Sequence, residues 1–179
     1  MSRKVRWLIH VSVLILILVS PTFYAIDAAQ AADRIGTRAI LEDDLIKAAP
    51  SRESYDQVKM ARERAFELSY RSSVDALAAA KDAVTLAESL LGPTNPTTGG
   101  CLGFLADRYE KEGDLQQAVE TQDRAMEIME SFAPNSPTTA LSYLAAAMIN
   151  RKAQENDRAR FLYHKALNLA EKVHGKNGN

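Results

Sequence analysis

The sequence has little of several residue types that would define a special class of protein. A single cysteine in 179 residues supplies neither a disulfide framework nor a zinc site built from several cysteines. Eight glycines and six prolines are too few for a collagen-like or low-complexity chain. With 22 basic and 23 acidic residues, the chain has no excess positive charge for binding nucleic acid. Its 46% hydrophobic and 25% charged residues instead match an ordinary globular domain.

The segment 1–31 has the three-part pattern of a secretory signal. A basic stretch at 2–6 precedes an apolar run at 8–19, and the small residues Ala29 and Ala31 suit the pocket of a signal peptidase. We therefore expect a signal peptide over 1–31 and a mature chain that is periplasmic or secreted. Cleavage removes three basic residues and one acidic residue, which leaves 19 basic against 22 acidic residues and a net charge of −3.

The alternative for this segment is an uncleaved anchor. Residues 7–26 are about long enough to cross a bilayer of roughly 30 Å, although several polar residues and a proline interrupt the run. In either case the basic start keeps the N-terminus inside, so the rest of the chain lies outside the cytoplasm. No cysteine directly follows the apolar run, which excludes a lipoprotein.

The rest of the chain is repetitive, with a period of about 41 residues. The segment 93–98, Pro-Thr-Asn-Pro-Thr-Thr, returns as Pro-Asn-Ser-Pro-Thr-Thr at 134–139. The repeat defines three units, 53–92, 93–133 and 134–175, of which the first is the most degenerate. Within each unit apolar residues recur three and four apart, which predicts two amphipathic helices. The result is an all-α domain over 51–175, followed by a tail at 176–179.

Pairs of alanines seven residues apart occur in each unit, about two helical turns from one another. They are expected to let a neighbouring helix approach closely, and they are Ala76 and Ala83, Ala118 and Ala125, and Ala159 and Ala166. Turn and capping residues are expected to break the hairpins, and prolines to separate the units. The breaks are Ser72-Ser73, Gly113-Asp114 and Asn156-Asp157, and the separating prolines are Pro93, Pro96, Pro134 and Pro137.

The second and third units resemble the roughly 42-residue tetratricopeptide repeat of the kinesin light chain type. The residues that carry the resemblance are Leu91-Gly92-Pro93-Thr94-Asn95-Pro96, Leu102, Leu105, Ala106, Tyr109, Gly113, Ala118, Ala125, the run 159–167 and the run 172–175. The resemblance covers about 53–175 and implies a right-handed superhelical stack of antiparallel helix pairs. It also implies that the first helix of each pair lines a concave groove that binds peptides or proteins.

The register of the repeat gives eight candidate groove residues. They are Tyr55, Lys59, Arg62, Phe66, Phe104, Arg108, Tyr143 and Ala147. Relatives carry two asparagines that hydrogen-bond the backbone of a bound peptide, whereas this chain has Gly103 and Phe104, and then Leu144 and Ala145, at those places. This lining favours an apolar ligand segment, or a groove that another element closes.

No motif in the chain carries catalysis, and we expect no enzyme, no cofactor and no metal site. His164 and His174 lack a further ligand at metal-binding spacing, and the consecutive residues of Glu42-Asp43-Asp44 fan around a helix instead of converging on one ion. The segment 94–100 lacks the glycine spacing and the lysine of a phosphate loop. No nucleophile elbow is present.

Two features outside the repeats have open interpretations. Cys101 is expected to be buried, with an intermolecular disulfide as the alternative. Residues 33–49, within the lead segment 32–50, are predicted to form a short amphipathic helix that caps the stack or covers the degenerate first unit, or else one that docks loosely.

The last helix has an apolar surface wider than one neighbouring helix covers. We expect Phe161, Tyr163, Leu167 and Leu169 to include contacts with a partner protein or a second copy. The alternative is that they are exposed singly and need no partner.

These observations favour an exported, non-catalytic scaffold that binds a partner protein or peptide. Two other functions remain open at this point. One is a membrane-anchored envelope assembly factor, and the other is a self-assembling structural protein.

Overall fold

The computed structural model of the protein describes the backbone of residues 37–176 and the side chains of residues 42–173. The chain falls into two parts, Met1–Asp44 and Leu45–Asn179, and the helix hairpins lie in the second part. The expected signal over 1–31 and the segment 177–179 lie outside the described residues. Within the segment 33–49, where a short amphipathic helix was expected, the structure describes α3 (Thr37–Ala48), and residues 33–36 lie outside the described residues.

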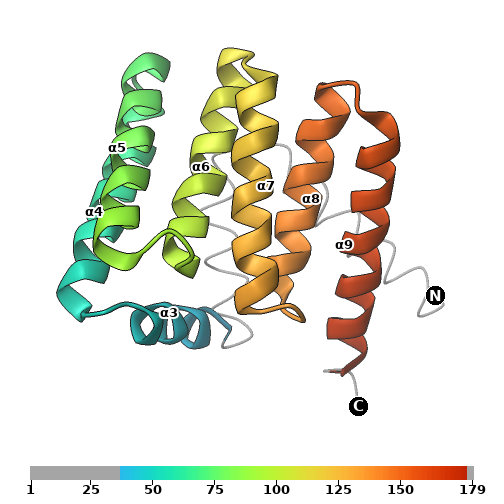
Figure 1. Ribbon diagram of the computed structural model, residues 1–179, viewed down its shortest axis with the longest axis horizontal. Helices are drawn as coiled ribbons and strands as arrows, with labels where there is room; N and C mark the ends of the chain where they lie inside the picture. Colours follow the sequence, from blue (N-terminus) through green and yellow to red (C-terminus); the bar gives the residue numbers. More distant parts are fainter. Residues whose placement is uncertain (1–36, 177–179) are drawn as a thin grey trace, which may run out of the picture. The chain divides into compact units, whose positions relative to one another are not determined.

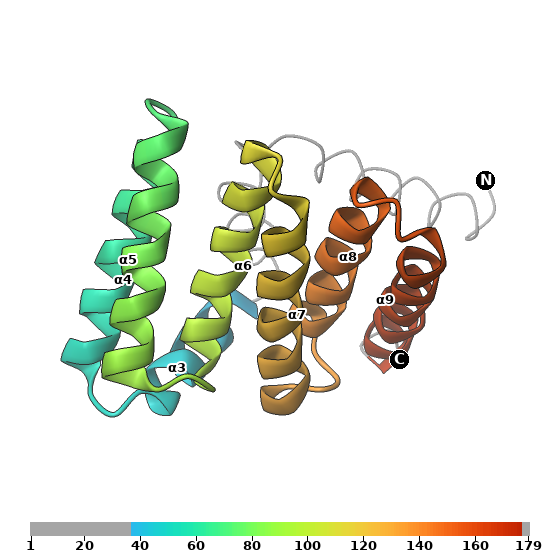
Figure 2. The same ribbon diagram turned by 45° about the horizontal axis from the view of Figure 1, so that its top comes forward.

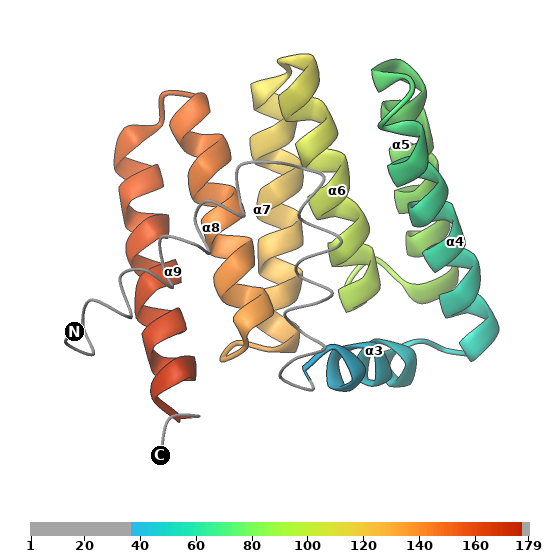
Figure 3. The ribbon, with the colours of Figure 1, turned by 180° about the vertical axis from the view of Figure 1, so that it is seen from behind.

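Three consecutive helix hairpins follow α3. Their helices are α4 (Arg52–Leu68) and α5 (Ser73–Leu91), α6 (Pro96–Glu112) and α7 (Leu115–Phe132), and α8 (Pro137–Lys152) and α9 (Asn156–Lys176). Each hairpin packs on the next, α5 against α6 and α7 against α8. Figures 1 and 3 show the row of hairpins from opposite sides, and Figure 2 shows the two helices of each hairpin running side by side. No strand occurs in the described part of the chain, which confirms the expected all-α helical repeat solenoid.

The paired alanines all lie in the core. Each is at most 8% exposed, and Ala76 and Ala118 are fully buried. An alanine has no branch beyond its Cβ, so these positions let the second helix of each hairpin lie close against its neighbours. The expectation that they are packing residues is confirmed.

Short polar side chains begin the helices. In five of the described helices the N-cap side chain accepts a hydrogen bond from a backbone N–H of the first turn, which satisfies a donor that has no partner within the helix. These caps are Ser51, Ser72, Asn95, Asp114 and Ser136. Pro96 and Pro137 begin α6 and α8. This position was expected, because a helix accommodates proline well only in its first turn.

The hairpin turns differ in one place from the expectation. Gly113 ends α6 with φ +82° and Asp114 caps α7, as expected. In the third hairpin, however, Asn156 is already the first residue of α9, and the turn lies before it. Gln154 takes the left-handed conformation there, with φ +66°. A residue other than glycine thus makes this turn, which is why the sequence did not mark it.

The repeated Pro-Thr-Thr has a structural role that the sequence alone did not assign. The second threonine of each copy is fully buried, and its hydroxyl bonds the loop that precedes the helix. Thr98 donates to the carbonyl oxygen of Gly92 at 2.8 Å, and Thr139 donates to that of Ala133 at 2.6 Å. Each threonine therefore ties its first helix to the end of the preceding hairpin.

A glycine and the cysteine of α6 occupy closely packed positions. A Cβ atom on Gly99 would lie 3.1 Å from the side chain of Ile128 and 3.6 Å from the carbonyl oxygen of Ala125, so α6 and α7 lie close together at that glycine. Cys101 is 1% exposed, which confirms the expected burial. Burial raises the pKa of its thiol to about 11, against a smaller lowering by Arg62.

Ala48 and Ala49, which lie just before the hairpins in the sequence, are joined to the same core. The side-chain amide of Asn95 donates to the carbonyl oxygen of Ala48 at 2.8 Å, and Ala49 packs on the cluster that includes Val58 and Leu102. The residues that directly follow α3 therefore belong to the packed body.

Candidate protein-binding surfaces

An aromatic cluster joins the first helices of two neighbouring hairpins. Phe66 of α4 lies 6.2 Å from Phe104 of α6, centroid to centroid, and meets Tyr70 edge-on at 5.2 Å. The guanidinium of Arg108 lies 4.9 Å from the centroid of the Phe104 ring, within the range of a cation–π contact. We call these four residues the α4–α6 surface. Phe66 and Phe104 are half-buried and Tyr70 is 55% exposed, whereas Arg108 is only 6% exposed and therefore supports the Phe104 ring instead of offering area to a partner. The exposed parts of the aromatic residues are an arrangement that suits protein contacts.

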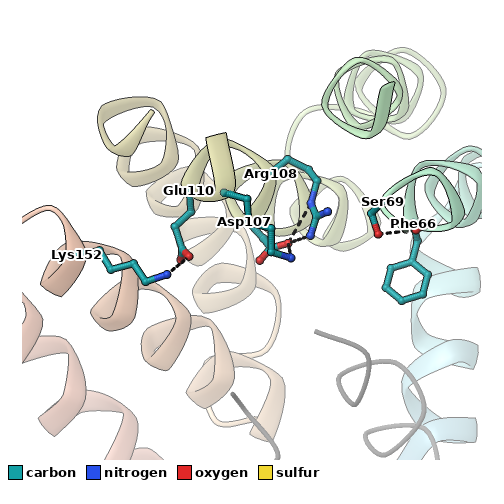
Figure 4. A network of polar contacts seen from close by, with 7 residues as sticks. Phe66, Ser69, Asp107, Arg108, Glu110 and Lys152 are labelled. Atoms are coloured by element: carbon teal, nitrogen blue, oxygen red, sulfur yellow. Dashed lines mark hydrogen bonds and ion pairs between the residues drawn. The ribbon is translucent and has the colours of Figure 1, made fainter. Parts of the chain in front are cut away.

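Figure 4 shows polar contacts of Arg108 and of its neighbours on α6. Asp107 accepts from Nε of Arg108 at 3.1 Å and from Lys111 at 3.1 Å. Glu110 of α6 pairs with Lys152 of α8. This contact links the first helix of the second hairpin to the first helix of the third. The carboxylate of Asp107 balances the Arg108 charge, which leaves the guanidinium held in place over the ring.

The remaining groove candidates fall into two groups. Lys59 and Arg62 are half-buried on α4, and a Cβ atom on Gly100 would lie 3.3 Å from Nη1 of Arg62. Tyr55, Tyr143 and Ala147, in contrast, are 3%, 5% and 0% exposed and lie in the core. Their small exposed area leaves little to contact a partner, because the register placed them on the correct helices but could not show how deeply each is packed. The binding role of all eight candidates stays a prediction.

At the places where the resemblance implies two asparagines, the structure has half-buried apolar or small side chains. Phe104 takes part in the α4–α6 surface, and a Cβ atom on the adjacent Gly103 would lie 3.8 Å from Gln122 of α7. Leu144 packs against the cluster of α8 and α9. None of these side chains carries an amide that could bond a peptide backbone.

The four candidates on α9 separate into three environments. Leu169 is 9% exposed and packs inward against α8, so it has little surface for a partner. Phe161 is 60% exposed, with the ammonium of Lys165 at 5.7 Å from its ring centroid. Leu167 is 43% exposed and Tyr163 is half-buried. Their contact with a partner or a second copy stays a prediction.

A polar cluster joins three helices at the last joint. Glu130 of α7, Tyr143 of α8 and Lys165 of α9 meet there, with 3.3 Å between Glu130 Oε1 and the Lys165 ammonium, which also lies over the Tyr143 ring at 4.6 Å. A hydrogen bond with Tyr143 lowers the pKa of Glu130, and burial followed by the same bond raises the pKa of Tyr143. The cluster stabilises the charged carboxylate and the neutral phenol, and it thus holds the joint in one arrangement.

Sequence reasoning missed three residues of these surfaces. Tyr70 follows Phe66 by one helical turn and is 55% exposed, and that spacing would have indicated it. Asp107 precedes Arg108 directly and gave no signal, since adjacent residues on a helix do not face one another. Glu130 was part of a repeated segment, but only the fold brings it to Tyr143.

Neither a metal-ligand cluster nor a membrane-spanning helix occurs among the described residues. Over that part of the chain, no three residues of the types His, Cys, Asp or Glu come together in a way that would hold a metal ion. Of the helices that the structure describes, none is both long and apolar enough for a membrane span.

Residues 109–172, from the end of α6 through most of α9, match the family model described as tetratricopeptide repeat. No curated protein matches the chain. The family match and the stacked hairpins together support a tetratricopeptide repeat protein. Such repeats generally mediate protein–protein interactions, and the family is typically a non-catalytic scaffold. The first hairpin, α4 and α5, lies outside the matched residues.

Proposed function

We propose that this protein is an exported, non-catalytic scaffold that binds a partner protein through the α4–α6 surface. The observation that carries the proposal is the pairing of Phe66 with Phe104 across two neighbouring first helices, with Arg108 over the second ring. Aromatic residues are among the residue types on which binding energy concentrates at protein interfaces, and the buried Arg108 supports the Phe104 ring.

The chemistry of this surface favours a partner segment with an apolar or aromatic side chain. Phe104 stands where the resemblance implies an amide, so the chain contacts the partner through its aromatic rings rather than through hydrogen bonds to the partner's backbone. Tyr70 adds a hydroxyl at the edge and is 55% exposed. A short amphipathic helix or an extended apolar segment satisfies these requirements.

A photo-crosslinking experiment tests the surface. A benzophenone amino acid in place of Tyr70 should capture a defined partner in the native organism, whereas the same group in place of Glu120, exposed on α7, should not. Phe104→Asp in the Tyr70 background should abolish the product, because a charge at the ring position opposes apolar contact. Equal products from both positions, or a product unaffected by Phe104→Asp, would exclude this surface.

The same proposal includes export of the protein and the assignment of its repeats to the kinesin light chain type. The basic start, the apolar run and the small residues before Ala32 support export of the mature chain. N-terminal sequencing of the protein from the extracytoplasmic fraction should give Ala32 as the first residue. An intact N-terminus in the membrane fraction would favour the anchored assembly factor instead.

Self-assembly is the other alternative, because Phe161 and Leu167 of α9 are exposed apolar residues. Analytical ultracentrifugation distinguishes it from the main proposal. A monomer at high concentration is expected, and concentration-dependent association that Leu167→Asp abolishes would favour the structural role.

A further inference from the structure

We propose that Glu130, Tyr143 and Lys165 form an acid-sensitive latch between the second and third hairpins. While the Glu130 carboxylate is charged, the latch keeps this second joint closed. Protonation of the carboxylate opens the second joint, whereas the first joint, between the first and second hairpins, stays closed. Such a latch controls the conformation of the stack, which goes beyond the proposed binding function of the α4–α6 surface on the first two hairpins.

The latch connects one carboxylate to both helices of the third hairpin. Glu130 lies near the end of α7, and its Oε1 is 3.3 Å from the ammonium of Lys165 on α9. The same carboxylate accepts a hydrogen bond from the hydroxyl of Tyr143 on α8. The ammonium lies in turn 4.6 Å from the centroid of the Tyr143 ring. A single side chain of the second hairpin therefore contacts α8 and α9 at once.

The second and third hairpins share less of a common apolar core than the first two hairpins do. At the first joint one buried cluster includes Val84 and Leu91 of α5 together with Leu102 of α6. The buried cluster of the third hairpin consists of residues of α8 and α9, and α7 adds the half-buried Met126 to it. A smaller cluster places Ile149 of α8 against alanines of α6 and α7. Apolar packing therefore holds the second joint less extensively than the first.

Ion pairs are correspondingly more numerous at the second joint. In the described part of the chain one ion pair crosses the first joint and three cross the second. The first joint has Glu88 with Arg124, and the second has Glu110 with Lys152, Asp123 with Arg158 and Glu130 with Lys165. The side-chain amide of Gln122 also crosses the second joint and donates to the carbonyl oxygen of Ser142 at 3.3 Å. The second joint therefore depends on charge more than the first does.

The first joint contains the same three positions without the latch. Under the repeat offsets of 42 and 41, the equivalents of Glu130, Tyr143 and Lys165 are Glu88, Leu102 and Arg124. The ion pair recurs there, with 2.6 Å between Nη2 of Arg124 and Oε1 of Glu88. The phenol does not recur, because Leu102 is apolar and 1% exposed. The first joint thus provides an internal control for the hydrogen bond between carboxylate and phenol.

Glu130 is the member of the latch that changes charge in acid. Tyr143 from α8 and Lys165 from α9 are the titratable groups that the described contacts place against it. The hydrogen bond from Tyr143 lowers the pKa of Glu130, burial opposes this effect, and the charge of Lys165 lowers the pKa further. Burial acts to lower the pKa of Lys165, but the hydrogen bonds and charges of Tyr143 and Glu130 outweigh it and raise that pKa. Burial followed by the bond with Glu130 raises the pKa of Tyr143. In acid the ammonium therefore stays charged and the phenol stays neutral.

The direction of the pH effect follows from the lowered pKa of Glu130. Because the closed joint lowers this pKa below its ordinary value of 4.5, the closed joint binds fewer protons than the open joint does. The stabilisation of the closed joint is complete above pH 4.5 and is lost as the pH falls through the lowered pKa. A neutral carboxyl no longer attracts Lys165, and it accepts a weaker hydrogen bond from Tyr143.

Paired spin labels on the second helices measure each joint separately. Val74, Gln116 and Asp157 are exposed and occupy equivalent positions in the first turns of α5, α7 and α9. Val74→Cys with Gln116→Cys reports on the first joint, and Gln116→Cys with Asp157→Cys reports on the second. Both pairs are made in a Cys101→Ala background so that only the introduced thiols carry labels. Double electron–electron resonance from about pH 7 to about pH 3 should show a longer and broader second distance in acid, with the first distance unchanged.

Substitutions within the latch separate its charge from its packing. Glu130→Gln keeps the size of the side chain, and it should raise the open fraction at neutral pH several-fold and remove the dependence on pH. Glu88→Gln, at the equivalent position of the first joint, is the matched control and should leave both distances as in the wild type. Tyr143→Phe keeps the ring and removes the hydroxyl. It should move the acid transition to higher pH, because Glu130 then loses the hydrogen bond that lowers its pKa.

Circular dichroism at neutral pH verifies that each variant is folded. If Glu130→Gln does not fold, the wild-type pH profile and its shift in Tyr143→Phe still decide the question. A second distance that stays constant in acid overturns the latch, as does equal lengthening of both distances, because the stack then unfolds as a whole. An unshifted transition in Tyr143→Phe, or a wild-type pH dependence in Glu130→Gln, overturns it as well.

Discussion

At the scale of single residues, the alanines of α5, α7 and α9 decide how closely the hairpins approach. Ala76 and Ala118 are fully buried although alanine offers little apolar area. Their contribution is the space they leave, since cores are packed as densely as organic crystals and do not accept extra atoms freely.

Ala118→Leu is accordingly expected to lower the free energy of unfolding by about 1–3 kcal/mol, because three additional carbon atoms must enter a filled joint. Urea unfolding followed by circular dichroism measures the change. Ala78→Leu, at an exposed site of α5, is the matched control and should change stability by less than about 0.5 kcal/mol. Equal effects of the two substitutions would contradict close packing at Ala118.

Cys101 gives a second prediction, on reactivity and pH. Burial raises the pKa of its thiol from 9.0 to about 11, so the folded state favours the neutral form. The contribution of the buried neutral thiol to the free energy of unfolding is complete below pH 9, and it is lost as the pH rises through about 11. The wild type should therefore lose stability relative to Cys101→Ala over this interval. A thiol reagent at pH 8 should react only in denaturant, and rapid reaction of the folded protein would refute the burial.

At the scale of elements, glycines have opposite roles within one hairpin. Gly113 ends α6 with φ +82°, a conformation that side chains with a Cβ atom disfavour. Gly103 lies inside the same helix, where glycine costs conformational entropy. Location in the element, not residue type, thus determines what each glycine does.

Alanine substitutions should separate these roles. Gly113→Ala is expected to destabilise the protein by about 1–2 kcal/mol through backbone strain alone, because no atom lies within 4 Å of the new Cβ. Gly103→Ala should stabilise it by about 0.5–1 kcal/mol, since its Cβ would meet Gln122 at an ordinary 3.8 Å. Thermal unfolding of both variants measures the difference, and a shared direction of change would contradict the assignment.

At the scale of the whole molecule, the core is divided along the stack. One buried cluster draws on α4 to α7 and includes Val58 and Leu105, whereas another, with Tyr143 and Leu162, belongs to α8 and α9. In a stack where each hairpin contacts only its neighbours, stability is distributed over hairpins and joints rather than shared uniformly.

Leu162→Ala tests this division. Leu162 is 3% exposed, and its truncation should cost about 2–5 kcal/mol. Native-state hydrogen exchange should show this loss in the amides of α8 and α9, while the most protected amides of α5 and α6 keep their protection. A uniform loss over all helices would show that the stack unfolds as one unit.

Much of the fold could be predicted because the sequence repeats. The regular period and the apolar spacing gave the helix hairpins, and the caps Ser72 and Asp114 marked two of their turns. The third turn was misplaced, since Gln154 adopts positive φ without a glycine to indicate it. Local chemistry predicts a turn only when the residue that makes it has a distinctive preference.

The candidate surfaces were predictable only in part. The register placed Phe66 and Phe104 on first helices, and the structure shows their rings in contact. The same register could not separate them from Ala147, which is fully buried. Sequence spacing gives the direction of a side chain around its helix, but exposure depends on which neighbour covers that direction.

The sequence by itself determined the repeat, the helical class, the buried alanines and the burial of Cys101, because periodicity and side-chain volume act locally and recur in each unit. Only the tertiary structure decided which equivalent positions are covered. Leu167 and Val84 occupy the same place in their helices, yet one is 43% and the other 7% exposed. The difference is the hairpin that packs on α5 and has no counterpart on α9 among the described residues.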